Sequence, residues 1–106
     1  ANLNRVTVMG VLRRDPETKN FPNGGSITSF SIVTTDIGKY PTSEHKQATE
    51  WHRIITSNRL AEIACKYLKK GGKVYIEGSL RTRKWKDQSG IDREVTEIRA
   101  DELQLL

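Results

Sequence analysis

The stretch KVYIEGSLRTRKWK, residues 73–86, decides the fold. Side chains of a β-strand alternate between two faces, so this segment predicts one long strand with two unlike sides. The face predicted to be buried carries Val74, Ile76, Gly78 and Leu80. The opposite face carries Arg81, Arg83 and Trp85, which places guanidinium groups beside a large flat ring.

A second segment, TEWHRII at residues 49–55, repeats this arrangement. Trp51 and Arg53 are two residues apart, so they share a face of a strand. For Trp85 alone, the alternative is an ordinary core or interface aromatic with a solvated rim of arginines. Aromatic rings stack with bases of any sequence, and cations beside them neutralise phosphates. Because both tryptophans of the chain stand near arginine at strand spacing, the pattern favours a surface for unpaired nucleic acid.

Length and charge narrow the class of protein. A chain of 106 residues is expected to form a single domain, residues 1–106, with one modest core. The net charge of +5 favours polyanionic partners but does not choose between DNA, RNA and anionic lipid. No apolar run approaches the roughly 18 residues of a membrane span, and a lone Cys65 argues against a disulfide framework. We therefore expect a cytoplasmic protein without a membrane partner.

Other segments complete an all-β pattern. Alternating or β-branched residues predict further strands over residues 6–12, 27–35, 47–56 and 93–104. A single helix is predicted between the third and fourth strands, because an apolar stripe recurs there at helical spacing. The stripe consists of Leu60, Ile63, Ala64, Tyr67 and Leu68. Ser57 or Asn58 is expected to cap the start of this helix, and Gly71-Gly72 its end.

The order of these elements predicts the architecture. Three strands, one helix and two strands give a five-stranded barrel with the helix between strands three and four. This is the layout of the OB-fold, a common binder of oligonucleotides.

The chain resembles bacterial single-stranded DNA-binding proteins over essentially its whole length. The matching motifs are NRV (4–6), DP (15–16), PNGG (22–25), TEWHR (49–53), LAE (60–62), YLKKG (67–71), VYIEG (74–78) and LRTRKW (80–85). The resemblance implies an OB-fold protomer of a homotetramer that binds single-stranded DNA without sequence preference. It implies a nucleoid-associated role in DNA replication, recombination and repair, and a binding protein rather than an enzyme.

The resemblance also implies roles for particular residues. Trp51 and Trp85 would be base-stacking rings. The phosphate path would follow Arg53, Arg59, Lys69, Lys70, Arg81, Arg83 and Lys84. Lys69 and Lys70 have a second interpretation, since cations near the end of a helix complement its dipole.

Two positions depart from the family pattern. Where the family usually has a loop aromatic, this chain has Ile37, so we expect Tyr40 to substitute. Ser57 occupies a place where the family often has Phe, which predicts fewer or differently distributed stacking rings. The family also carries a flexible tail with an acidic tip that recruits replication and repair proteins. The chain stops at Leu106 without it, as expected of a shortened protein.

Assembly residues and rival functions complete the predictions. Tyr75 is expected to face outward at a subunit contact, with stacking on DNA as the alternative, and His52 is expected to be a structural or interface histidine. Neither a metal site nor a cofactor is expected, because two histidines and one cysteine have unrelated spacings. The rivals are a nuclease using Asp36, Glu44 and Glu50, and an OB-fold that serves a primosome or binds RNA.

Overall fold

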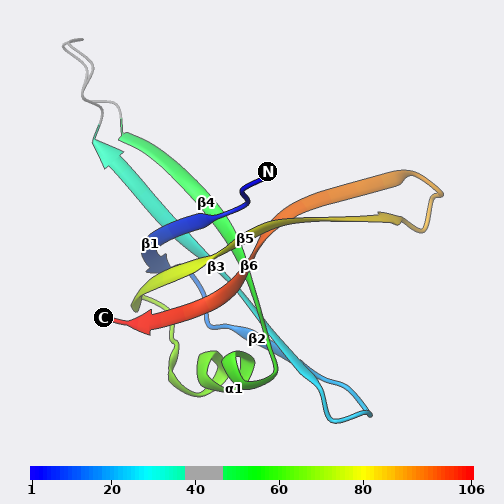
Figure 1. The fold of residues 1–106 in the computed structure, drawn as a ribbon, viewed down its shortest axis with the longest axis horizontal. Coiled ribbons are helices and arrows are strands. Elements are labelled where there is room, and N and C mark those ends of the chain that lie inside the picture. Colours follow the sequence, from blue (N-terminus) through cyan, green and yellow to red (C-terminus); the bar gives the residue numbers. More distant parts are fainter. Residues whose placement is uncertain (38–46) are drawn as a thin grey trace.

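The structure is a computed structural model that describes residues 1–37 and 47–106. In these ranges the chain forms six strands and one helix (Figure 1): β1 (Val6–Leu12), β2 (Glu17–Asn20), β3 (Ser26–Ile37), β4 (Gln47–Ser57), α1 (Asn58–Tyr67), β5 (Lys73–Lys86) and β6 (Asp92–Leu105). The predicted bounds of β5 are exact, and those of the other long strands differ by at most two residues. Tyr40, the predicted loop aromatic, lies outside the described residues.

The strands close into a barrel. The sheet runs in the order β1-β5-β6-β4-β3-β2, and a further pairing of β1 with β3 closes the first five strands of this order into a ring. In that pairing Val11 lies opposite Val33, while β4 and β6 meet in parallel at Ile54 and Ile98. This is the predicted five-stranded OB-fold barrel, and β2 is an addition to it. The short β2 pairs only with β3, and its polar residues gave no alternating signal.

The barrel interior is filled by the alternate residues of each strand. Leu12, Ile32, Ile54, Val74 and Ile76 are all buried. The predicted buried face of β5 ends sooner than expected, because Leu80 is 49% exposed. At that point β5 has left the barrel and continues into a projecting hairpin (Figure 1), so no second layer covers its inner side.

Helix α1 packs against the end of the barrel near β3 and β4. Ala61 and Ala64 are buried there, and the Thr28 hydroxyl donates a hydrogen bond of 2.8 Å to the Ala61 carbonyl. Two predictions about the helix are wrong. Tyr67 does not join the buried stripe, because it is 53% exposed. The helix also ends at Tyr67 rather than at Gly71-Gly72, since the backbone of Leu68 becomes extended and its side chain is buried.

Beyond the barrel, β5 and β6 form a projecting hairpin, called here the arm (residues 79–99; Figure 1). A tight turn closes its tip. The Asp87 carboxylate accepts hydrogen bonds from the Ser89 and Ile91 backbone amides, and Gly90 has φ +78°. At the root of the arm, the Asn4 side chain pairs with the Leu80 backbone through hydrogen bonds of 3.0 and 2.8 Å, which ties β5 down where it leaves the barrel.

Candidate nucleic-acid interface

A β-bulge divides the β5–β6 ladder into two parts. On the barrel side Glu77 pairs with Glu102, but the next pair is Gly78 with Ala100. Asp101 is therefore the extra residue of a bulge, and side chains that face outward on β6 change from even to odd numbers there. Without the extra residue, the even-numbered side chains of β6 would lie on this face in the arm, as they do on the barrel.

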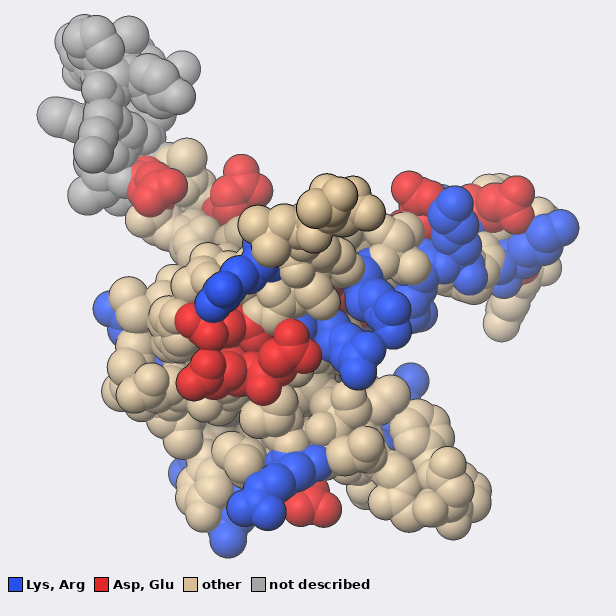
Figure 2. All heavy atoms as spheres, viewed as in Figure 1, with Lys and Arg blue, Asp and Glu red and all other residues tan. Residues whose placement is uncertain are grey.

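The bulge creates a continuous outer surface on β4, β5 and β6, called here the basic face. Residues paired across a ladder point to the same side, so the pairings given by the register define its members. The basic face consists of Trp51, Arg53, Arg81, Arg83, Trp85, Arg93 and Arg99. Figure 2 shows Lys and Arg side chains gathered where the arm leaves the barrel and continuing along the arm, where acidic side chains lie beside them, and a further group of acidic side chains on the barrel.

One buried carboxylate organises the centre of the basic face. Glu97 lies between Arg53 and Arg83, and each arginine donates through Nε at 2.7 Å to a different oxygen of the carboxylate. The Glu97 side chain is 2% exposed, whereas the two arginine side chains are about half exposed. Burial raises the pKa of Glu97, but hydrogen bonds and charge from Arg83 and Arg53 outweigh it and hold this pKa below its usual value. The hydrogen bond to Glu97 likewise raises the pKa of Arg83.

Both tryptophans are exposed on this face, and each has a guanidinium group against it. The Arg13 Cζ atom lies 4.9 Å from the centre of the Trp51 ring, and the Arg83 Cζ atom lies 5.1 Å from the centre of the Trp85 ring. The exposed fractions are 56% for Trp51 and 43% for Trp85. Large rings left open to water beside cations offer a stacking surface together with positive charge.

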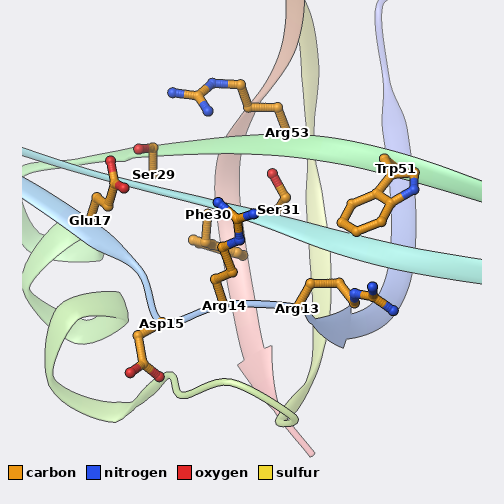
Figure 3. A pocket seen from close by; sticks show the side chains of 9 residues that line it. All are labelled: Arg13, Arg14, Asp15, Glu17, Ser29, Phe30, Ser31, Trp51 and Arg53. Atoms are coloured by element: carbon orange, nitrogen blue, oxygen red, sulfur yellow. The ribbon is translucent and has the colours of Figure 1, made fainter.

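The surface is hollowed next to Trp51, with a volume of about 380 Å³. Arg13 and Arg14 project from the segment between β1 and β2, and Trp51 and Arg53 come from β4 across the hollow (Figure 3). Ser31 of β3, paired with Arg53, adds a hydroxyl group. The rest of the lining is Asp15, Glu17, Ser29 and Phe30.

Three residues of this surface were not predicted from the sequence: Arg13, Arg14 and Glu97. The adjacent arginines directly after the first strand were a usable signal, because the loop between the first two strands of an OB-fold is one of its binding loops. Glu97 had no such signal, since its role depends on partners that are distant in the sequence.

The other residues predicted to lie on the phosphate path are found in different parts of the structure. The Lys70 backbone amide donates to Asp15 at 2.8 Å, so Lys69 and Lys70 lie next to the segment that carries Arg13 and Arg14. Lys84 is exposed but pairs with Glu94 on the opposite side of the arm from Trp85. Arg59 is exposed at the start of α1 and does not line the hollow.

The predicted assembly residues lie elsewhere on the barrel. Tyr75 points outward as expected, paired with Met9 of β1 on one side, and its hydroxyl donates a hydrogen bond to Glu77. The pKa of Tyr75 is raised, first by this hydrogen bond and then by burial and the neighbouring carboxylates. His52 faces away from Trp51, and its Nε2 atom lies 2.9 Å from the Thr34 hydroxyl. Its role as a structural or interface histidine stays a prediction.

Within the described residues, no helix is long and apolar enough to cross a membrane. In the same part of the chain, no three His, Cys, Asp or Glu side chains gather as a metal site would require.

Comparisons with known proteins agree with this geometry. The model of the Single-strand binding protein family matches residues 3–106 of the chain. A solved structure of Plasmodium falciparum SSB in complex with ssDNA is similar to this one, with a TM-score of 0.90 and 32% sequence identity. The similarity covers 100% of this chain and 97% of that chain, so it includes the arm as well as the barrel.

Proposed function

The chain belongs to the single-strand binding protein family, and we propose that it binds and protects single-stranded DNA without sequence preference through the basic face and the hollow beside Trp51. Members of this family are DNA-binding proteins and not enzymes, as the sequence analysis expected. The solved relative is a complex with ssDNA, which supports the choice of ligand.

One observation carries the proposal: two exposed tryptophans lie on one face, each with a guanidinium about 5 Å from its ring. Unpaired bases expose flat apolar surfaces that duplex DNA keeps stacked inside, and their phosphates lie close to those bases. Trp51 and Trp85 would stack on bases, while Arg53, Arg81 and Arg83 would contact phosphates. The hollow would admit the strand past Arg13 and Arg14, and Lys69 and Lys70 would extend the path.

Lack of sequence preference follows from the kind of contact. Stacking uses the face that every base has, and arginine contacts to phosphates carry no sequence information. Readout of base edges would need polar side chains held rigidly against one base. We therefore expect pyrimidine and purine oligonucleotides to bind with affinities that differ by less than the loss caused by removing one ring.

The test is a titration of the protein with poly-deoxythymidine while Trp emission is followed. We expect binding to quench the emission, because Trp51 and Trp85 would stack directly on bases. Replacement W85A should weaken binding by about 1 to 3 kcal/mol for each base stacked on that ring. Competition by duplex DNA should fail at concentrations where unpaired DNA competes fully, whereas tighter binding of RNA would support the rival RNA-binding function.

The matched control is Y67A on α1. Tyr67 is an aromatic residue with a similar exposed fraction, and a lysine lies 5.3 Å from its ring, but it is not on the basic face. Its removal should leave affinity unchanged. Equal affinities of W85A, Y67A and the unaltered protein, all folded, would defeat the stacking proposal.

We extend the proposal to a homotetramer that acts in replication, recombination and repair. The outer side of β1 supports this extension, because Met9 and Val11 are exposed there beside Tyr75. Joining several faces of this kind would raise the effective concentration of each for a long strand. Sedimentation equilibrium should give the mass of four chains, and a monomer at micromolar concentration that still binds long DNA tightly would contradict the assembly.

A further inference from the structure

Glu97 is an anomaly on a surface proposed to bind a polyanion. Among the described residues it is the one buried carboxylate, and it lies at the centre of the basic face. A carboxylate at this place repels phosphates, and its burial costs free energy unless it is paired. The simplest electrostatic expectation is that its removal would improve DNA binding.

The geometry argues the reverse. Arg53 contacts the carboxylate only through Nε, at 2.7 Å, and Arg83 contacts it through Nε at 2.7 Å and more weakly through Nη2 at 3.5 Å. A guanidinium has five N–H donors in a fixed fork. Both terminal nitrogens of Arg53 and Nη1 of Arg83 therefore keep their donors available, as far as the described residues show.

The carboxylate also connects three strands. Arg53 belongs to β4, Arg83 to β5 and Glu97 to β6, so one buried group fixes two long side chains relative to each other. Without it, two half-exposed arginines would sample many rotamers, and ordering them on a ligand would reduce affinity. Glu97 thus fixes each arginine through its Nε atom and leaves terminal nitrogens of each guanidinium group available to a ligand.

We propose that Glu97 is a positioning residue, which holds Arg53 and Arg83 by their Nε atoms so that their terminal nitrogens bind phosphates of an unpaired strand. This inference rests on the proposed function and deepens it. Under this inference the Glu97 carboxylate strengthens DNA binding, although its negative charge repels phosphates.

The test is E97Q, titrated with poly-deoxythymidine. Glutamine keeps the shape, but its amide nitrogen is a donor and faces one of the two Nε donors, so one arginine is released. We expect binding about tenfold weaker, the loss of one charge-assisted hydrogen bond, although the variant is more positive by one charge. The matched control is E94Q, which changes the same charge at an exposed position on the same strand and should bind as tightly as the unaltered protein or more tightly.

A second pair of variants separates positioning from a general structural role. R53K/R83K keeps both charges but lacks both Nε donors, so it should lose at least as much affinity as E97Q. Adding E97Q to R53K/R83K should then cost nothing further. If Glu97 only stabilised the fold, E97Q would weaken DNA binding in R53K/R83K as well. The loss of affinity would then follow the fraction of protein unfolded.

The outcomes are distinct. If the unaltered protein fails to bind poly-deoxythymidine, the proposed function fails. If it binds and E97Q or R53K/R83K binds as tightly, the role of Glu97 is overturned and the proposed function stands. Should E97Q fail to fold, R53K/R83K alone still decides, because the inference requires it to bind weakly while folded.

Discussion

The two ends of the β5–β6 ladder use the same residue type in opposite ways. In the arm, a single carboxylate, Glu97, lies between two guanidinium groups, and its pKa is lowered despite burial. At the barrel end, Glu77 lies directly opposite Glu102. There the hydrogen bond from Tyr75 lowers the pKa of Glu77, while the contact with Glu77 raises the pKa of Glu102.

This contrast shows that the neighbouring side chains, and not the residue type, decide how a glutamate affects each end of the ladder. A carboxylate shared by two cations is held charged and rigid, which suits a surface that must present arginines. Two carboxylates side by side repel each other, which raises the pKa of one of them, and they form a surface that does not attract phosphates. The bulge at Gly78 and Asp101 separates them, because it changes which residues of β6 face outward.

The largest effect should come from breaking this boundary with G78A. A Cβ atom on Gly78 would lie 1.9 Å from the carbonyl oxygen of Arg99, and backbone atoms cannot yield as a side chain would. The ladder would have to open at the bulge. We expect a loss of about 3 kcal/mol or more in the free energy of unfolding, measured by urea denaturation.

The control for G78A is G25A in the β2–β3 turn. There an added Cβ would meet only the side chains of Asn23 and Asn58, the nearest atom at 3.2 Å. Its cost should be well below that of G78A. Equal stability of G78A and the unaltered protein would show that the bulge does not fix the boundary.

The next effect concerns salt dependence and the arginines that the sequence analysis missed. If Arg13 and Arg14 each contact a phosphate, R13A/R14A should reduce the slope of log affinity against log salt by roughly 1.4, about 0.7 for each contact with a single strand. Fluorescence titrations over a range of salt concentrations measure it. R5A removes a charge near the acidic end, 4.0 Å from Glu77, and should leave the slope unchanged. An equal change in both proteins would mean that net charge alone, and not the hollow, sets the slope.

Much of the fold was predictable because the strands alternate clearly. Residues 73–86 gave β5 exactly, and the same alternation placed Trp51 with Arg53 and Arg83 with Trp85 on outer faces. The bulge left a trace that was overlooked, since the apolar positions of β6 change from Ile98 and Ala100 to Leu103, from even to odd. A change of phase within a strand is what an extra residue produces.

The remaining features depend on tertiary contacts. The end of α1 was misplaced because Leu68 gains more from burial in an extended conformation than from another helical residue, and no local signal encodes that choice. Glu97 looks in the sequence like any surface glutamate of a strand. Only the closure of the barrel brings it between arginines 44 and 14 residues away.

The smallest effect should come from the acidic end, with E102Q, and its sign depends on pH. The pKa of Glu102 is raised, so its protonated form favours the folded state, and that contribution is present below the usual value of 4.5 and lost as the pH rises through the raised pKa. Glu77, with a lowered pKa, loses its contribution only as the pH falls below 4.5.

Glutamine imitates the protonated form of Glu102 at every pH. E102Q and the unaltered protein should therefore have similar Tm near pH 4.5, and E102Q should have a slightly higher Tm at neutral pH, measured by calorimetry. E94Q in the arm should show the opposite sign at neutral pH, because Glu94 pairs with Lys84. A rise in Tm for both variants would indicate a general charge effect and would remove the distinction between the two ends of the ladder.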